Sequence, residues 1–313
     1  MTIAVPASPP SLPLGAELDP LLGREFESPW RDTTRRFFRN KLAVAGLVFL
    51  VIVTFGAVFA PLLSRWDPKV SDFQGILDSK TGVQDYGPSS RHWLGTDRIG
   101  RDIFSRLLFG ARVSLSVGWS VALVSTVMAI VIGGLAGWYL KAGGVIMRLA
   151  DMISALPYIV FVVFMTERLG RTMLAVILAL LAYGWTSGAR LFRAGVLQAK
   201  GQDYVEAARA TGCSSLRVLF RHILPNAIQP MIVGISFSIG GLILTESVFG
   251  FLGLGIVDRP AWGQMVAEGR EEIFENGHMF LFPAMALVFT VLAFAFIGEG
   301  LRDALDPKLR GIR

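Results

Sequence analysis

Residues 204–226 contain Tyr204-Val-Glu-Ala-Ala-Arg-Ala-Thr-Gly212 and, after a short basic run, Arg221-His-Ile-Leu-Pro225-Asn226. The alanines favour a helix, and Gly212 can end it because glycine readily adopts a positive φ. Ser214 or Ser215 can cap a second helix, and Pro225 is expected to end that helix. The stretch is therefore predicted to form a helix, a turn and a second helix between two apolar spans.

The rest of the chain has the composition of a membrane protein. Of 313 residues, 53% are hydrophobic and 17% charged, and the mean hydropathy is +0.55. Soluble domains carry about 25% charged residues, and a helix needs about 20 apolar residues to cross a bilayer. We expect an all-α integral membrane protein with six transmembrane helices, since lipid leaves the backbone no other partners. The candidate spans are 42–63, 113–139, 146–166, 173–191, 228–249 and 279–299.

Basic residues at the ends of the spans predict the orientation. Arg31, Arg35, Arg36, Arg39 and Lys41 precede the first span, which places the N-terminus in the cytoplasm. Six spans return the C-terminus to the same side. Orientation explains the net charge of +6 better than nucleic-acid binding does. A single cysteine excludes a disulfide framework within the chain and a multi-cysteine metal site.

The chain divides into five parts by composition. The first thirty residues are rich in proline and lack the apolar region of a signal peptide, so we expect a largely disordered tail there. The expected parts are a cytoplasmic tail 1–39, a first transmembrane helix 40–63, an extracytoplasmic loop 64–105 with an interfacial segment, a five-helix core 110–305 that includes a cytoplasmic loop 192–226, and a cytoplasmic C-terminus 306–313.

The 204–226 stretch resembles the EAA motif, a cytoplasmic loop in permease subunits of bacterial ABC importers. Six residues match the family pattern in register: Glu206, Ala207, Ala208, Gly212, Leu224 and Pro225. His222 departs from it, but Arg-His-x-Leu-Pro-Asn is similar to peptide-importer permeases. The resemblance implies docking to an ATPase, with Tyr204 beside a small-residue face and Glu206 offering a carboxylate. The alternative is an ordinary amphipathic cytoplasmic helix.

A second segment, His92–Arg106 continuing to Gly110–Leu115, resembles the peptide and nickel branch of these permeases, and specifically its C-type subunit. Its motif residues are Gly95, Thr96, Asp97, Gly100, Arg101 and Asp102. Phe249–Gly255, the Trp262-Gly263 pair and Gly298–Pro307 resemble the same branch. Charges of alternating sign over Asp97–Arg106 predict an interfacial helix with ion pairs. It would serve as a gate, as a contact for a binding protein, or as a structural cap.

A few residues within the spans are candidates for the gate or the pathway. Glu246 should face protein or water, either at an external gate or in a structural hydrogen bond. The glycines around Phe249 and Phe251 suggest a tight external turn. Pro157 and Phe161 would kink and line a pathway, although packed or lipid-facing aromatics are the alternative. A set of glycines, Gly133, Gly134 and Gly137, predicts close helix packing.

The resemblance implies a type I ABC importer permease for di- or oligopeptides in the bacterial cytoplasmic (inner) membrane. It implies a B-type permease, two ABC ATPase subunits and an extracytoplasmic peptide-binding protein as partners, with ATP and Mg on the ATPases. The chain has no G-x-x-x-x-G-K-[ST] pattern, so we expect no ATP site of its own. The resemblance implies a permease subunit that is not an enzyme and that binds no cofactor or metal.

Three other functions have different requirements. A nickel or other small-solute permease of the same branch stays open. An ion-coupled secondary transporter needs ionisable groups in mid-membrane, and an ion channel needs a selectivity filter. The spans hold few ionisable groups and no recognisable selectivity filter. A membrane scaffold would leave the 204–226 stretch unexplained.

Overall fold

A computed structural model describes residues 29–72 and 86–305 of the chain. These residues form helices and loops, with two isolated β-bridges. The helices are α1 Pro29–Arg39, α2 Lys41–Val58, α3 Ala60–Leu63, α4 Ile103–Trp138, α5 Leu140–Ser154, α6 Tyr158–Leu169, α7 Met173–Lys200, α8 Asp203–Ala210, α9 Ser215–Val218, the π-helix η1 Leu219–Ile223, α10 Leu224–Ala227, α11 Gln229–Phe251, α12 Trp262–Arg270 and α13 His278–Leu305.

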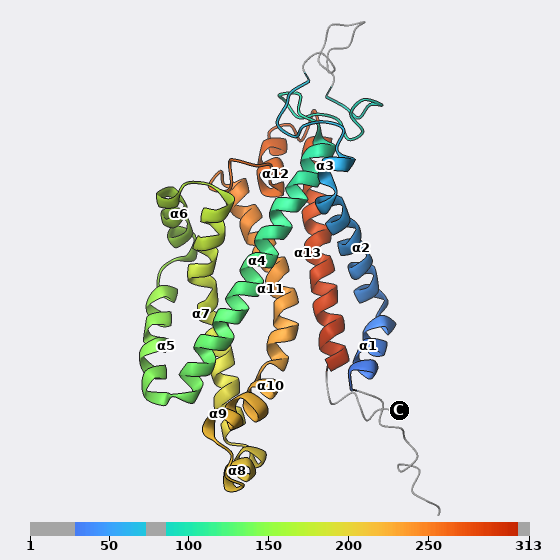
Figure 1. Ribbon diagram of the computed structural model, residues 1–313. Helices are drawn as coiled ribbons and strands as arrows, with labels where there is room; N and C mark the ends of the chain where they lie inside the picture. The colour runs from blue at the N-terminus through green and yellow to red at the C-terminus, as the bar shows by residue number, and fades with distance from the viewer. Residues whose placement is uncertain (1–28, 73–85, 306–313) are drawn as a thin grey trace, which may run out of the picture.

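In the described part of the chain, five helices are long and apolar enough to cross a membrane: α2, α4, α7, α11 and α13. They run side by side along the long axis of the molecule, with α5 and α6 outside α7 (Figure 1). Together α5 and α6 pass the same test as a pair bent by 85°, which gives six spans if the pair counts as one. The prediction of an all-α membrane protein is confirmed, and the third span differs from a continuous helix.

The break in the third span has a local cause. Residues 155–157 interrupt the helix, and Pro157 is the N-cap residue of α6 with extended backbone. Proline disfavours helical backbone at the residue before it, so α5 ends just ahead of Leu156-Pro157. The kink expected at Pro157 is therefore a complete break.

Side-chain caps fix the start of three spans. Asn40 Oδ1 accepts hydrogen bonds from the N–H groups of Leu42 and Ala43 at the start of α2, at 3.1 and 3.2 Å. Asp102 caps α4 at Ser105 N, at 2.7 Å, and Thr172 caps α7. Each cap satisfies N–H groups that have no partner within the helix.

Several boundaries differ from the sequence expectation. The second span begins ten residues before position 113, because Asp102 caps α4 at Ile103. The α7 helix continues to Lys200, so the loop expected from residue 192 begins only at Gly201. Part of the expected tail, 29–39, is helix α1, while residues 1–28 and 306–313 lie outside the described part of the chain.

The most extensive helix pairing is between α4 and α7. A Cβ atom on Gly133 would lie 2.5 Å from the carbonyl oxygen of Ala189, and one on Gly137 would lie 2.8 Å from Val196 Cβ. Glycines therefore allow the two helices to approach closely, as such small residues do in membrane bundles. The packing role predicted for this glycine set is confirmed.

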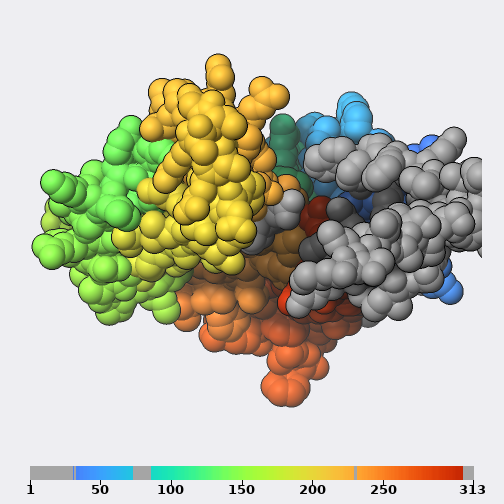
Figure 2. Space-filling model, turned by 90° about the horizontal axis from the view of Figure 1, so that it is seen from below, coloured from blue at the N-terminus to red at the C-terminus, as the bar shows by residue number. Residues whose placement is uncertain are grey.

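The two ends of the bundle carry different elements. Helices α8, α9 and α10 lie at one end, near the level of α1, and α3 and α12 lie at the other (Figure 1). Seen from the first end, the segment that contains α8 projects in front of the long helices (Figure 2). The two motif-bearing segments, 201–228 and 86–106, therefore lie at opposite ends of the bundle.

Candidate functional site

The turn after α8 is a Schellman motif around Gly212. Gly212 has φ +79°, its N–H bonds to the carbonyl of Arg209 at 2.9 Å, and the N–H of Cys213 bonds to the carbonyl of Ala208 at 3.1 Å. This pattern closes a helix C-terminus and requires a left-handed residue, which favours glycine. The predicted helix, turn and second helix are confirmed, with Ser214 at the N-cap position of α9 but without a side-chain cap.

The residues expected to contact an ATPase divide between two faces of the loop. Tyr204, Glu206, Ala207, Gly212 and Pro225 are exposed. Two others point inward: Ala208 is buried beside Val205, and Leu224 packs against the same cluster. The exposed residues lie on the surface of the loop, and the buried ones attach the loop to the bundle.

Two exposed apolar side chains extend this surface. Leu216 is 59% exposed and Phe220 is 64% exposed, on the segment that follows α8. The sequence does not distinguish them from the neighbouring apolar residues of 216–220. Burial distinguishes them from Val218 and Leu219, which pack inward.

Pro225 does not end the second helix, contrary to expectation. It lies in the first turn of α10, where a missing N–H is tolerated. The π-helix Leu219–Ile223 directly precedes it, and the N–H of Leu224 bonds to the carbonyl of Leu219. The wider turn lets the chain continue through the proline to α11, which begins at Gln229.

The loop is also joined to the end of α4 by an aromatic contact. The Lys200 ammonium lies 4.8 Å from the ring centroid of Trp138, and the Arg209 guanidinium lies 5.9 Å from it. Lys200 also donates hydrogen bonds to the carbonyls of Gly137 and Trp138, at 3.2 and 3.0 Å. Cations over an indole face are attracted by the ring, and a lysine at a helix C-terminus satisfies its last carbonyls. Trp138 therefore connects α8 and the end of α7 to α4.

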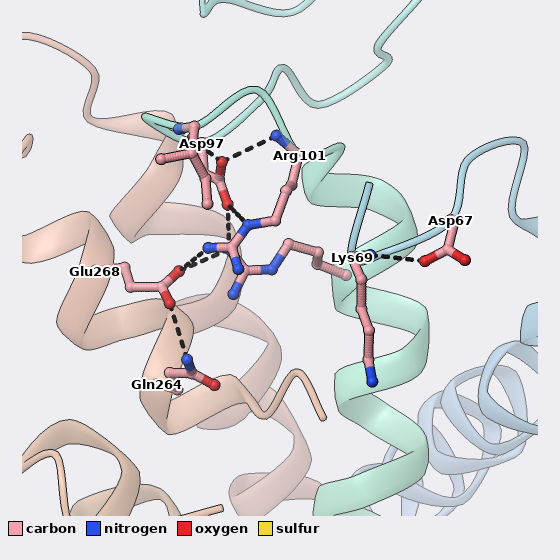
Figure 3. A network of polar contacts seen from close by, with 8 residues as sticks. Asp67, Lys69, Asp97, Arg101, Gln264 and Glu268 are labelled. Carbon is pink, nitrogen blue, oxygen red and sulfur yellow. Dashed lines mark hydrogen bonds and ion pairs between the residues drawn. The ribbon is translucent and has the colours of Figure 1, made fainter. Parts of the chain in front are cut away.

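A network of charges lies at the opposite end of the bundle (Figure 3). Arg101 Nε is 2.6 Å from Asp97 Oδ2, and Arg106 Nη1 is 2.6 Å from Glu268 Oε2. Arg106 also pairs with Asp97, Arg101 pairs with Glu268 at 3.0 Å, and Gln264 donates to Glu268 at 3.0 Å. The ion pairs expected here are present, and they include a partner, Glu268, that the sequence did not indicate.

The interfacial helix predicted over Asp97–Arg106 is wrong for its first part. Residues 86–102 form turns and bridges, and α4 begins only at Ile103. Gly95 and Gly100 have φ of +80° and +78°, which a right-handed helix does not allow. Asp97 Oδ1 accepts two backbone N–H groups, at 3.0 and 3.1 Å, so it stabilises a turn.

The same turn organises the remaining motif residues. Thr96 forms an isolated bridge with Asp102. Asp102 Oδ1 lies 2.9 Å from His92 Nδ1, and His92 Nε2 lies 3.3 Å from Asp72 Oδ2. His92 and Asp102 are both buried. Residues 86–102 therefore form a compact segment next to the start of α4, which we call the plug. The charge network joins the plug to α12.

The candidate gate and pathway residues fall into three places. Phe249 and Phe161 belong to one aromatic cluster: Phe249 lies 6.0 Å from Tyr158, Phe161 lies 5.8 Å from Tyr183, and the two tyrosine rings are 4.8 Å apart. The break at Pro157 directly precedes Tyr158. Phe251 lies apart from them, beneath the guanidinium of Arg270.

Glu246 contacts a neighbouring span rather than an open cavity. It is 0% exposed, and its Oε2 accepts a hydrogen bond from Ser114 Oγ of α4 at 3.0 Å. The turn that follows α11 has Gly253 at φ +73°, with the N–H of Leu254 bonded to the carbonyl of Phe249 at 2.8 Å. This is the tight turn expected there. In residues 29–72 and 86–305, no three His, Cys, Asp or Glu side chains converge as metal ligands.

Comparison with known families agrees with this arrangement. Residues 125–311 match the model described as "Binding-protein-dependent transport system inner membrane component". Residues 28–80 match the model described as "N-terminal TM domain of oligopeptide transport permease C".

Three relatives match almost the whole chain. The glutathione transport system permease protein GsiD of Pectobacterium atrosepticum is 38% identical, over 94% of this chain and 96% of the relative. The oligopeptide permease OppC of Bacillus subtilis is 36% identical, over 90% and 91%. The di/tripeptide permease DppC of Pseudomonas aeruginosa is 37% identical, over 97% of both chains.

A solved structure shows a similar fold. A chain of the MetNI methionine ABC transporter, in inward-facing conformations, matches with a TM-score of 0.53 and 17% identity. The match covers 64% of this chain and 97% of that chain. The chain therefore belongs to the family of binding-protein-dependent transport system inner membrane components, as a multi-pass, non-catalytic permease subunit of an ABC importer of the oligopeptide permease C type.

Proposed function

We propose that this permease imports di- or oligopeptides. The three relatives described above are named for transport of glutathione, oligopeptides and di- or tripeptides, which are all peptides. Their similarity extends over at least nine-tenths of this chain. A nickel or other small-solute permease is the second candidate, favoured only by the shared sequence branch.

The loop Gly201–Ile228 is proposed as the docking site for an ABC ATPase. The single observation that carries this assignment is its geometry: a helix closed at Gly212, with Tyr204, Glu206 and Ala207 exposed on it and Val205 buried beneath. A docking loop needs a surface for the partner and a rigid attachment to the spans, and this loop has both. The loop would bind one of two ATPase subunits, and the B-type permease would bind the other.

Movement of this loop would reach the spans through packed contacts. Val205 and Ala208 belong to one cluster with Phe192 and Val196 of α7 and Met231 of α11. When the ATPases close on ATP and Mg, bound by the ATPases and not by this chain, the loop and these helices move as a unit. Such rigid-body changes relayed through packed interfaces are common in switching proteins.

The proposed orientation follows from the same assignment. Docking to an ATPase places the α8–α10 end in the cytoplasm, together with both termini of the chain. The plug 86–102 and helix α12 then face the outside, where an extracytoplasmic peptide-binding protein delivers substrate. The cluster around Phe249 and Phe161 would border the pathway of the assembled pair.

A gentle detergent pull-down of the tagged chain, with mass spectrometry of its partners, tests this function. We expect a homologous permease, ABC ATPases and a binding protein. Peptides bound to that binding protein would establish the substrate class, whereas nickel or another small solute would replace the peptide proposal. A chain recovered alone, under conditions that preserve such complexes, would contradict the docking role of the loop.

A further inference from the structure

Helix α1 carries a stripe of exposed arginines. Arg31, Arg35 and Arg39 are four residues apart, so they lie on one face of the helix. All three are exposed, and within the described residues none of them forms an ion pair. Like charges four residues apart on a helix repel one another unless a counter-charge is near. The stripe therefore favours an anionic partner.

The opposite side of α1 fixes this stripe in place. Phe37 lies two residues from Arg35, about 200° around the helix. It is 9% exposed and packs in a cluster with Ala43 of α2 and Ala304 of α13. A Cβ atom on Gly300 would lie 3.3 Å from the Phe37 ring, so α13 meets α1 closely because it has a glycine there. The arginines accordingly point away from the bundle.

The position of α1 places this stripe at a membrane surface. Only Asn40 separates α1 from α2, a candidate membrane span, and the contact with Ala304 lies at the end of α13, another such span. In Figure 1, α1 lies beside the lower ends of α2 and α13. Phe38 is 58% exposed and lies close to the line of Arg31 on the helix surface. A basic helix with an exposed aromatic at the edge of a span is typical of an interfacial helix.

We propose that Arg31, Arg35 and Arg39 bind the phosphate groups of anionic phospholipids, with Phe38 inserted among the acyl chains. A guanidinium donates two parallel hydrogen bonds to phosphate oxygens, which suits arginine to this ligand. Phosphatidylglycerol carries a net negative charge, whereas the choline group of phosphatidylcholine cancels that of its phosphate. The site should therefore select by charge, and the selectivity should fall as salt rises.

This inference does not depend on the transported substrate. It concerns the outer surface of α1, α2 and α13. Helices α6 and α7, which carry Phe161 and Tyr183 of the aromatic cluster, lie at the other side of the bundle, and α8 lies apart from α1 (Figure 1). Lipid binding there would hold the first span against the last one. A chain that carries no peptide at all would bind the same lipid, so the two proposals fail separately.

Native mass spectrometry of the assembled complex in neutral detergent tests the site. Phosphatidylglycerol and phosphatidylcholine with identical acyl chains are titrated in turn. We expect phosphatidylglycerol to bind about tenfold more tightly than phosphatidylcholine, because each basic residue near an anionic surface adds to the free energy of binding. The triple variant Arg31→Gln, Arg35→Gln, Arg39→Gln should lose this preference. The triple lysine variant should keep most of it.

Three controls keep the test decisive. The variant Arg65→Gln, Arg112→Gln, Arg259→Gln removes three arginines at the other end of the bundle and should leave the preference unchanged. Phe38→Ser should weaken the binding of both lipids to the same extent. If this variant binds both lipids as tightly as the unchanged protein, Phe38 is not inserted among the acyl chains. Equal binding of the two lipids, a preference retained by the triple glutamine variant, or displacement of the lipid by millimolar inorganic phosphate would overturn the lipid site.

Discussion

The guanidinium of Arg106 lies 2.6 Å from the carboxylate of Glu268, and this ion pair joins the start of α4 to α12. Arg106 is 2% exposed, so its charge depends on the two carboxylates around it, Glu268 and Asp97. A buried charge that loses a partner is costly, because water cannot replace that partner. The network therefore holds the plug 86–102, α4 and α12 in one arrangement.

The two carboxylates should differ in importance. Asp97→Asn removes a charge that is 7% exposed and also bonds the backbone of its own turn, so we expect a loss of about 3 kcal/mol. Glu268→Gln removes a charge whose side chain is 33% exposed, and the loss should be about 1 kcal/mol. Thermal unfolding of the purified complex measures both. Equal losses, or a larger loss for Glu268→Gln, would contradict the proposed burial of the network.

Gly212 offers a test of the turn after α8. A Cβ atom there would have nothing within 4 Å, so Gly212→Ala acts through its φ of +79° alone. A left-handed alanine costs about 1–2 kcal/mol, which should disturb the end of α8 and lower both transport and transport-coupled ATP hydrolysis. Gly201→Ala is the matched control, because Gly201 has φ −91° and should tolerate the change. Unchanged rates for Gly212→Ala would remove the turn from the coupling mechanism.

Trp138 is predicted to transmit movement from α8 to α4. Trp138→Leu keeps an apolar side chain but removes the ring under Lys200 and Arg209, worth about 1 kcal/mol for each cation. We expect the complex to assemble and hydrolyse ATP, with more ATP used for each substrate transported. Arg209→Gln should act in the same direction. If transport and hydrolysis fall in proportion, Trp138 has a structural role only.

Glu206 is expected to contact the ATPase directly. It is exposed in the first turn of α8, and Glu206→Lys should weaken co-purification of the ATPases by placing a cation against their surface. Asp203→Lys is the matched control, because Asp203 is exposed in the same turn and its replacement also exchanges a negative charge for a positive one near the N-terminus of α8. Intact co-purification with Glu206→Lys, or equal loss with Asp203→Lys, would argue against a specific contact at Glu206.

Local rules account for the parts of the structure that the sequence predicted. The turn at Gly212 follows from helix propensity and the left-handed freedom of glycine, which act within a few residues. The long spans follow from their apolar length. At Pro225 the same local reasoning failed, because a π-helix before the proline leaves its missing N–H without consequence.

Long-range partners explain why the charged motif was only partly predictable. Charge spacing over Asp97–Arg106 indicated ion pairs, but a helix and a turn both bring such charges together. The choice depended on Gly95 and Gly100 at positive φ, and on Glu268, more than 160 residues away in the chain. No periodicity in the sequence indicated Glu268 as that partner. Conversely, Ala207 is exposed and Ala208 is buried, although the motif predicted the same role for both.

Glu246 shows how a structural role can be separated from a gating role. Its Oε2 accepts a hydrogen bond from Ser114 Oγ at 3.0 Å, and the side chain has no exposed surface. Glu246→Gln keeps a hydrogen-bond acceptor of the same size, so we expect nearly normal thermal stability and transport.

Glu246→Ala leaves a cavity and an unpaired hydroxyl on Ser114, and should cost about 2–3 kcal/mol. Because the two residues are in contact, Ser114→Ala combined with Glu246→Ala should cost less than the sum of the single changes. Thermal unfolding of the four complexes measures this coupling. Loss of transport in Glu246→Gln at unchanged stability would instead assign the carboxylate to the gate.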